Sequence, residues 1–378
     1  MKLVMTLLVR DEADVVEAQI AFHLHAGVDY VIATDNLSQD GTSEVLERFA
    51  REGHLHLIRE TGTDFRQREW VTRMARLAAT DYDADWVINA DADEFWWPRG
   101  ADLKEVLAAV PRRYGVVHAL WRSFIPPPEN GEFFAERMTV RAASRAPIND
   151  PSSTFRPQQK VAHRADPLVV LSSGNHGILE ASRPLVPLRG WYPIEILHFP
   201  ARSMEQWERK NLATLAGWRE NPRGFGTAYH EKLLHAHEHG QVSDQYSAIA
   251  LEQEQLARGL EDGVLATDTR LRDALRSIRR GSGTAPGFLL PSERRLQLPR
   301  PTLVDDALFA VEIAALADAN LVRLERRIDD LERRVMLPGP GLGTRSAEEA
   351  KRVTRWLKRQ CSKPLKAVLT RSRDGHPR

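Results

Sequence analysis

The segment WVINADADEF, residues 86–95, combines a run of mainly apolar residues with an acidic cluster that follows it directly. Residues 86–90 have the composition of a buried strand, and Asp91, Asp93 and Glu94 come immediately after them. In an open α/β sheet, ligands bind beyond the carboxyl ends of the strands. Because carboxylates repel one another, this cluster favours a divalent cation, which prefers oxygen ligands. A D-x-D pair alone is a weak signal, and its place after an apolar strand strengthens it.

The chain up to this segment alternates between strand-like and helix-like patterns. Apolar runs predict strands, and apolar residues at helical spacing predict the helices between them. The predicted strands are 2–9, 30–34, 54–59 and 86–90, and the predicted helices are 14–26, 43–52 and 67–79. Strands and helices that alternate at this spacing favour parallel pairing with right-handed crossovers. The sequence therefore predicts a doubly wound α/β domain with a mostly parallel sheet.

Two further polar loops follow predicted strands. Residues 10–12, RDE, follow the first strand, and residues 35–42, DNLSQDGT, follow the second. Asp, Asn and Ser side chains cap turns and helix starts, so one interpretation is an ordinary capped loop. The other is a nucleotide pocket in which Asp35 or Asn36 bonds the base or ribose. Since the carboxyl ends of parallel strands share one edge of a sheet, we expect the three polar loops to meet in one crevice.

Four motifs in the first quarter of the chain resemble the family 2-like glycosyltransferases with the GT-A fold. They are LLVRDE at 7–12, HLHAGV at 23–28, DNLSQDGT at 35–42 and INADADEF at 88–95. The resemblance is closest to the branch with Asp-Asn-x-Ser-x-Asp-Gly-Thr and Asp-x-Asp-Glu-Phe motifs. It is specific in the order and spacing of these motifs and extends more weakly to about residue 212.

The resemblance implies transfer of a sugar from a UDP- or GDP-sugar to an acceptor hydroxyl, with inversion. The acceptor would be a glycan or a lipid-linked molecule, in glycan or polysaccharide assembly. Asp91 and Asp93 would hold Mn²⁺ or Mg²⁺ on the donor diphosphate, and Glu94 completes the predicted catalytic motif. The nucleotide would lie against Arg10, Glu12, Asp35 and Asn36. No catalytic base aligns with the family, and the candidates are Glu129, Asp150 and Glu195.

Two arginines and two histidines add to the predicted site. Arg66 and Arg68, at the start of a predicted helix, could bond the diphosphate, although a solvated helix start with ordinary ion pairs explains them equally well. GT-A enzymes often complete the metal or diphosphate shell with a histidine from later in the domain. Here the resemblance favours His176 or His198 as a metal ligand, although most of the 13 histidines in a chain of this kind are expected to be structural or exposed.

The amino-acid composition limits the classes of protein to which the chain can belong. The chain has 378 residues, 42% of them hydrophobic, so disorder over its whole length is excluded. Its single cysteine, Cys361, excludes an internal disulfide framework. The apolar residues 1–9 are too few to span a membrane and lack a cleavage site, so we expect a buried strand and a cytoplasmic protein.

The organisation changes after the α/β region. We predict a catalytic domain over 1–215, a mixed helical and loop extension over 216–310, a coiled-coil-like helix over 311–337 and a basic tail over 338–378. Apolar residues in the helix repeat at spacings of three and four, which fits either packing on its own domain or a homodimer. Residues 345–378 carry 11 Lys and Arg against 3 Asp and Glu. This tail could be solvated or could contact an anionic membrane from its inner face.

Other classes fit the sequence less well. A dehydrogenase would show Gly-x-Gly-x-x-Gly near its first strand, and none is present. Phosphotransferases with an Asp-x-Asp nucleophile carry the motif after the first strand, whereas here it follows the fourth. Nucleic-acid binding is disfavoured, because no aromatic and basic stacking module accompanies the tail. The remaining alternative is a non-catalytic GT-A-fold scaffold that acts through its coiled coil and tail.

Overall fold

The computed structural model describes residues 1–63, 66–143, 155, 157–220, 234–281 and 287–336. The chain divides into two compact units, residues 1–312 and 313–378. Within the second unit the described part is the end of helix α11 (Leu303–Met336), which begins earlier than the predicted coiled-coil-like helix. The predicted basic tail and the candidate base Asp150 lie outside the described residues.

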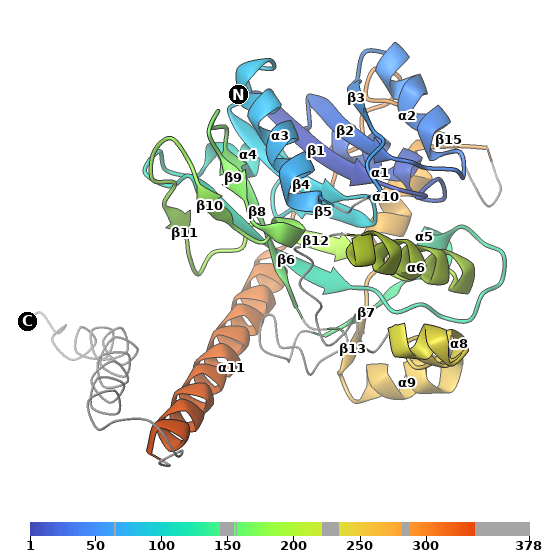
Figure 1. The fold of residues 1–378 in the computed structure, drawn as a ribbon, viewed down its shortest axis with the longest axis vertical. Helices are drawn as coiled ribbons and strands as arrows, with labels where there is room; N and C mark the ends of the chain where they lie inside the picture. Colours follow the sequence, from blue (N-terminus) through green and yellow to red (C-terminus); the bar gives the residue numbers. More distant parts are fainter. Residues whose placement is uncertain (64–65, 144–154, 156, 221–233, 282–286, 337–378) are drawn as a thin grey trace, which may run out of the picture. The chain divides into compact units, whose positions relative to one another are not determined.

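The first unit is built on a nine-stranded sheet (Figure 1). Its first half consists of parallel strands in the order β3 (Leu55–Glu60), β2 (Tyr30–Asn36), β1 (Leu3–Val9) and β4 (Trp86–Asp91). The predicted α/β class with a mostly parallel sheet is therefore confirmed.

The second half of the sheet mixes directions. Strand β8 (Gln159–Arg164) pairs antiparallel with both β4 and β6 (Val116–Ser123). Strand β12 (Ile194–His198) runs parallel to β6 and antiparallel to β5 (Glu94–Pro98), and the short β11 (Pro187–Leu188) also pairs with β6. The antiparallel pairing brings the start of β5 beside the end of β12, so that Glu94 is in register with His198.

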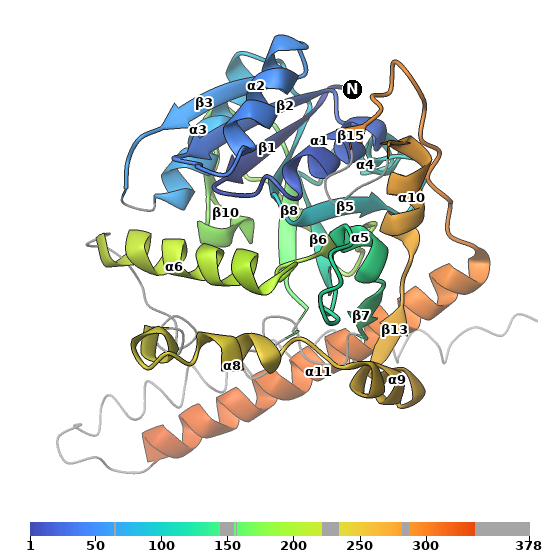
Figure 2. The same cartoon turned by 90° about the vertical axis from the view of Figure 1, so that its right-hand side faces the viewer.

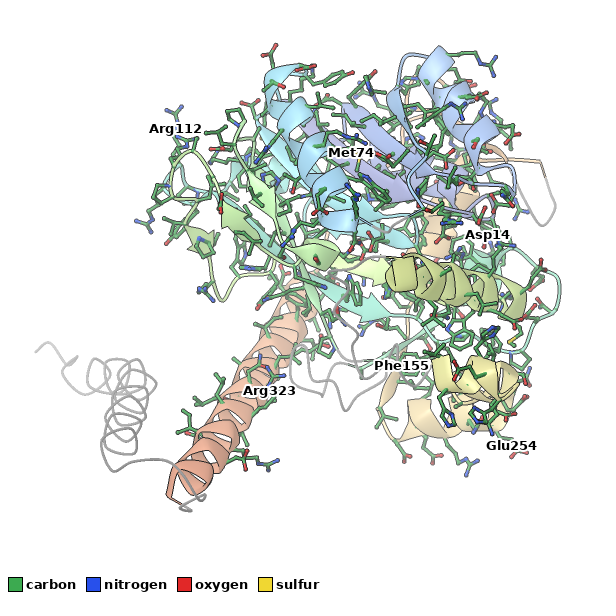
Figure 3. All side chains as sticks on the ribbon, in the orientation of Figure 1. Asp14, Met74, Arg112, Phe155, Glu254 and Arg323 are labelled. Atoms are coloured by element: carbon green, nitrogen blue, oxygen red, sulfur yellow. The ribbon has the colours of Figure 1, made fainter. Side chains whose placement is uncertain are left out.

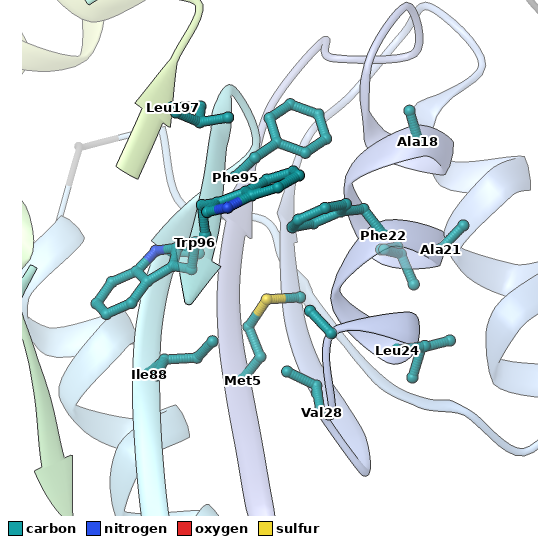
Figure 4. Packing of buried hydrophobic residues seen from close by; sticks show 14 of the residues in the cluster. Met5, Ala18, Ala21, Phe22, Leu24, Val28, Ile88, Phe95, Trp96 and Leu197 are labelled. Carbon is teal, nitrogen blue, oxygen red and sulfur yellow. The ribbon is translucent and has the colours of Figure 1, made fainter. Parts of the chain in front are cut away.

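Helices cover both faces of strand β1. Leu3, Met5 and Leu7 share one buried cluster with helix α1 (Val16–His25), whereas Val4 shares another with helix α3 (Gln67–Thr80). Figure 4 shows the first cluster, in which the ring of Phe22 from α1 lies near Phe95. A strand buried on both faces requires apolar residues at successive positions, which is the pattern of residues 3–9.

The remaining elements of the first unit surround this sheet (Figure 2). The helices are α2 (Thr42–Arg51), α4 (Leu103–Ala108), α5 (Phe134–Arg137), a 3₁₀ turn (Ser173–Asn175), α6 (Met204–Glu220), α8 (Val242–Ser247), α9 (Gln253–Glu261) and α10 (Arg270–Ile278). The short strands are β7 (Val140–Ala142), β9 (Val170–Leu171), β10 (Ile178–Glu180), β13 (Leu265–Thr267), β14 (Arg279–Arg280) and β15 (Gly287–Phe288). In the part of the chain that the structure describes, no helix is both long enough and apolar enough to cross a bilayer.

Candidate functional site

A cavity of about 140 Å³ lies where β1, β2 and β4 end and where α6 crosses them. Its lining comprises Leu8, Val9, Arg10, Glu12, Asn36, Gln67, Asp91, Ala92, Lys210, Ala213 and Thr214. Four residues predicted from the sequence therefore meet here, namely Arg10, Glu12, Asn36 and Asp91. The carboxyl ends of adjacent parallel strands place them together.

Hydrogen bonds join the two polar loops that follow β1 and β2. The backbone N–H of Gln39 donates to Asp11 Oδ1 at 2.7 Å, and that of Asp11 donates to Ser38 Oγ at 3.1 Å. Asp11 and Leu37 adopt φ values of 55° and 60°, in the left-handed region that non-glycine residues rarely occupy. Residues kept in such conformations cluster at binding sites, so this loop geometry is consistent with a functional role.

The aspartate and the asparagine of the second loop have different surroundings. The buried Asp35 carboxylate accepts hydrogen bonds from the Ser43 hydroxyl and from the backbone of Ser38 at 3.2 Å. It is not among the residues that line the cavity, and its contacts are those of a capped loop. Asn36 does line the cavity, and its amide nitrogen donates to Gly62 O at 2.8 Å.

Lys160 of β8 binds two of the predicted catalytic carboxylates. Its Nζ donates to Asp91 Oδ2 and lies 2.9 Å from Glu94 Oε1. Glu94 also accepts from the Trp121 indole at 2.8 Å and from the Asp91 backbone at 3.1 Å. Burial raises the pKa of Glu94 to about 8, although the Lys160 ammonium opposes the shift. Glu94 is fully buried and is not part of the cavity lining, so it supports Asp91 and does not reach a ligand there.

Lys210 of α6 binds the second aspartate of the motif. Its Nζ lies 2.6 Å from Asp93 Oδ2 and 2.9 Å from Glu12 Oε1. Burial alone would raise the pKa of Asp93, but the neighbouring groups that favour its ionised form, first among them Lys210, together outweigh burial and lower that pKa well below its usual range. Burial raises the pKa of Glu12 despite the opposing charges of Lys210 and Arg202. Lys210 itself is about one-third exposed and faces the cavity.

Arg202 anchors the first loop to the end of β12. The guanidinium is buried, bonds Glu12, and contacts Asp14 at 2.6 and 2.9 Å (Figure 3 labels Asp14). It also donates to Phe199 O at 3.1 Å, and the Phe199 N–H donates to Asp93 O at 2.9 Å. This chain of bonds fixes Glu12 and the Asp93 backbone relative to each other.

The two predicted histidine ligands have different positions. His198 Nε2 lies 3.7 Å from Asp93 Oδ2, and its ring stacks on Trp121 with centroids 4.0 Å apart. Burial lowers the pKa of His198 to about 4, so the imidazole is neutral near pH 7. His176 Nδ1 pairs with Gln159 O at 2.8 Å, and its ring meets Trp121 edge-on at 6.2 Å.

The predicted arginines of α3 lie outside this cavity. Arg66 lines a separate hollow of about 490 Å³ together with Glu60, Thr61, Gly62, Glu69, Trp70 and Arg73. Arg68 is partly exposed, and its guanidinium lies 3.8 Å from Glu69. The structure therefore does not bring these two arginines together with Arg10 and Asp91.

Neither of the described base candidates lines the cavity. Glu195 lies on the opposite face of β12 from His198, because side chains alternate along a strand. Its carboxylate is bound by three arginines, Arg99 at 3.1 Å, Arg122 at 2.7 Å and Arg270 at 2.9 Å. Glu129 is exposed and accepts from the Met204 backbone at 2.6 Å. The catalytic base thus stays unassigned.

The arrangement of these residues does not fit the predicted Mn²⁺ or Mg²⁺. Carboxylates and a neutral imidazole are donors that such ions accept. However, Asp91 is already paired with Lys160, and Asp93 with Lys210. Over the described ranges, no three or more His, Cys, Asp or Glu side chains are grouped so that they could hold a metal ion. The predicted ligand set Asp91, Asp93, His176 and His198 is therefore not assembled as a metal site.

Comparison with known proteins gives no family for the chain. No protein-family model matches it, and no curated protein does. Among solved structures it is similar to S. aureus TarS 1-349, at 13% identity and a TM-score of 0.30, over 57% of this chain and 66% of that one. It is also similar to glucosyl-3-phosphoglycerate synthase from Mycobacterium tuberculosis in complex with Mg²⁺ and UDP, at 20% identity and a TM-score of 0.23. That match covers 32% of this chain and less than half of the synthase chain, at 43%. At these TM-scores the similarities add nothing to what the sheet topology shows.

Proposed function

We propose that the cavity binds the nucleoside diphosphate of a UDP- or GDP-sugar and that the chain transfers the sugar to an acceptor hydroxyl. The observation that carries the proposal is the meeting of Arg10, Asn36, Asp91 and Lys210 at the carboxyl ends of parallel strands. The four sequence motifs that resemble GT-A enzymes support it, since three of them contribute residues to the lining of this cavity.

The side chains around the cavity suit the parts of such a donor. Arg10 and Lys210 present cationic donors, which diphosphate oxygens accept. Asn36 lines the same cavity, and we assign the base or ribose to it. During transfer, negative charge develops on the leaving diphosphate, and fixed cations stabilise it. Inversion would require a carboxylate to take the proton of the acceptor hydroxyl.

Arg10→Gln tests the site through turnover. Arg10 lines the cavity, and its buried Nε lies 4.0 Å from Asp11 Oδ2 and makes no hydrogen bond among the described residues. With a panel of UDP- and GDP-sugars and water as the acceptor of the sugar, we expect the chain to hydrolyse one class of donor and release its nucleoside diphosphate, and the variant to lose about 10- to 100-fold in kcat/KM. Arg112→Gln, at an exposed arginine outside the cavity, should leave the rate unchanged. Absence of release from every donor would contradict the proposal and favour the scaffold alternative.

Two predicted interactions, a homodimer and a membrane contact, stay predictions. Helix α11 exposes Val311, Val322 and Leu324, which is consistent with the predicted homodimer through residues 311–337. Membrane contact through residues 345–378 concerns a segment outside the described ranges.

A further inference from the structure

Two lysines occupy the place at which the sequence predicts a divalent cation. Lys160 reaches Asp91 from β8, and Lys210 reaches Asp93 from α6. The lysines come from different elements, and each binds a second carboxylate as well, Glu94 at 2.9 Å and Glu12 at 2.9 Å respectively. Both aspartates of the D-x-D motif are thus compensated by the chain itself.

A divalent cation would have to break these contacts. The Lys160 side chain is 1% exposed, so removing Asp91 from it would leave an ammonium group buried beside Glu94 alone. Asp93 is 4% exposed and holds Lys210, so a cation there would displace the ammonium group from its closest carboxylate. Separating a buried ion pair carries a high cost in free energy. These contacts therefore disfavour cation binding at either aspartate.

The same contacts orient the Lys210 side chain towards the cavity. Its side chain is 36% exposed and lines the cavity together with Arg10. Asp93 and Glu12 hold the ammonium group from one side, and Arg202 in turn fixes Glu12. Lys210 is thus a positioned positive charge that is open to the cavity.

We propose that Lys210, together with Arg10, supplies the positive charge at the donor diphosphate, so that nucleotide binding does not require a divalent cation. This inference rests on the proposed function and identifies the side chains that compensate the diphosphate charge in that same site. Asp93 and Glu12 act as positioning residues for Lys210, and Lys160 positions Asp91.

Calorimetric titration of UDP and GDP into the full chain tests the inference, once in EDTA and once in Mn²⁺. We expect one of the two nucleotides to bind with a Kd that agrees within about 3-fold between the conditions. Mn²⁺ alone, followed by its electron paramagnetic resonance signal, should show no tight site. Neither measurement on the wild type depends on the folding of a variant.

Substitutions of Lys210 test whether this residue supplies the positive charge. Lys210→Met should weaken binding about 10- to 100-fold in EDTA and in Mn²⁺ alike, and Lys210→Arg should recover part of the loss. Lys104→Met, at a partly exposed lysine paired with Asp29, is the matched control and should bind like the wild type. Binding that appears only with Mn²⁺ would overturn this inference and leave the proposed function intact. No binding of either nucleotide under any condition would overturn both.

Discussion

Replacing Arg202 by methionine should lower the free energy of unfolding by ~3–5 kcal/mol. The guanidinium is buried and compensates Glu12, which is itself buried, and Asp14. Methionine keeps much of the apolar volume but leaves the Glu12 carboxylate without this partner and the Phe199 carbonyl without its Arg202 donor. Glu12 keeps Lys210 as its remaining cation, but a buried carboxylate that loses its arginine destabilises the fold by far more than the intact pair stabilises it. Chemical denaturation at pH 7, monitored by circular dichroism, measures the loss.

Arg300→Met is the matched control for this substitution. Arg300 pairs with Glu105 at 3.1 Å, but both side chains are largely exposed. Exposed ion pairs contribute ~0–1 kcal/mol, so the control should scarcely change stability. Equal losses in the two variants would show that the Arg202 contacts do not hold the first loop as described.

Replacing Lys160 by methionine should cost ~3 kcal/mol at pH 6 to 7, at the lower end of the range for broken buried pairs, because Asp91 is about a third exposed. The cost should grow with pH. Burial raises the pKa of Glu94 in the folded chain to about 8, above the ordinary value of 4.5. Between these two pH values the folded chain binds one proton more than the unfolded chain, so the free energy of unfolding falls as pH rises. Without the opposing charge of Lys160, that pKa rises further, and the decline continues above pH 8 at up to ~1.4 kcal/mol per pH unit.

Denaturation of both proteins at pH 6 and pH 9 measures this dependence. Lys104→Met should cost ~0–1 kcal/mol at both values, since its partner Asp29 is about a third exposed. A Lys160→Met penalty that is the same at pH 6 and pH 9 would mean that Lys160 does not change the protonation of Glu94 over this range, and would contradict the electrostatic description of this carboxyl group.

The fold of the first third follows from local patterns. The apolar runs at β1, β2 and β4, and the polar residues that end them, were sufficient to predict parallel pairing and to place Arg10, Asn36 and Asp91 at one edge. Such predictions need only the period of the sequence and the geometry of crossover connections.

The ion pairs made by the two lysines that complete the site could not be predicted in this way. Lys160 reaches Asp91 because β8 inserts antiparallel between β4 and β6, a pairing set by contacts far apart in the sequence. Lys210 lies on a helix among other polar residues, where a lysine is ordinarily solvated. Lys160 and Arg202 lie in the weaker part of the resemblance, which extends to about residue 212; this was a hint of importance but did not identify their partners. The metal prediction rested on the carboxylates alone, because their cationic partners, Lys160 and Lys210, lie far from them in the sequence.

The most direct test of the central claim is a crystal structure of the chain with the nucleoside diphosphate that it binds most tightly. We predict the diphosphate within hydrogen-bond distance of Lys210 and Arg10, and the base or ribose beside Asn36. A nucleotide bound elsewhere would contradict the claim, for example in the arginine-lined cavity around Glu195, of about 430 Å³.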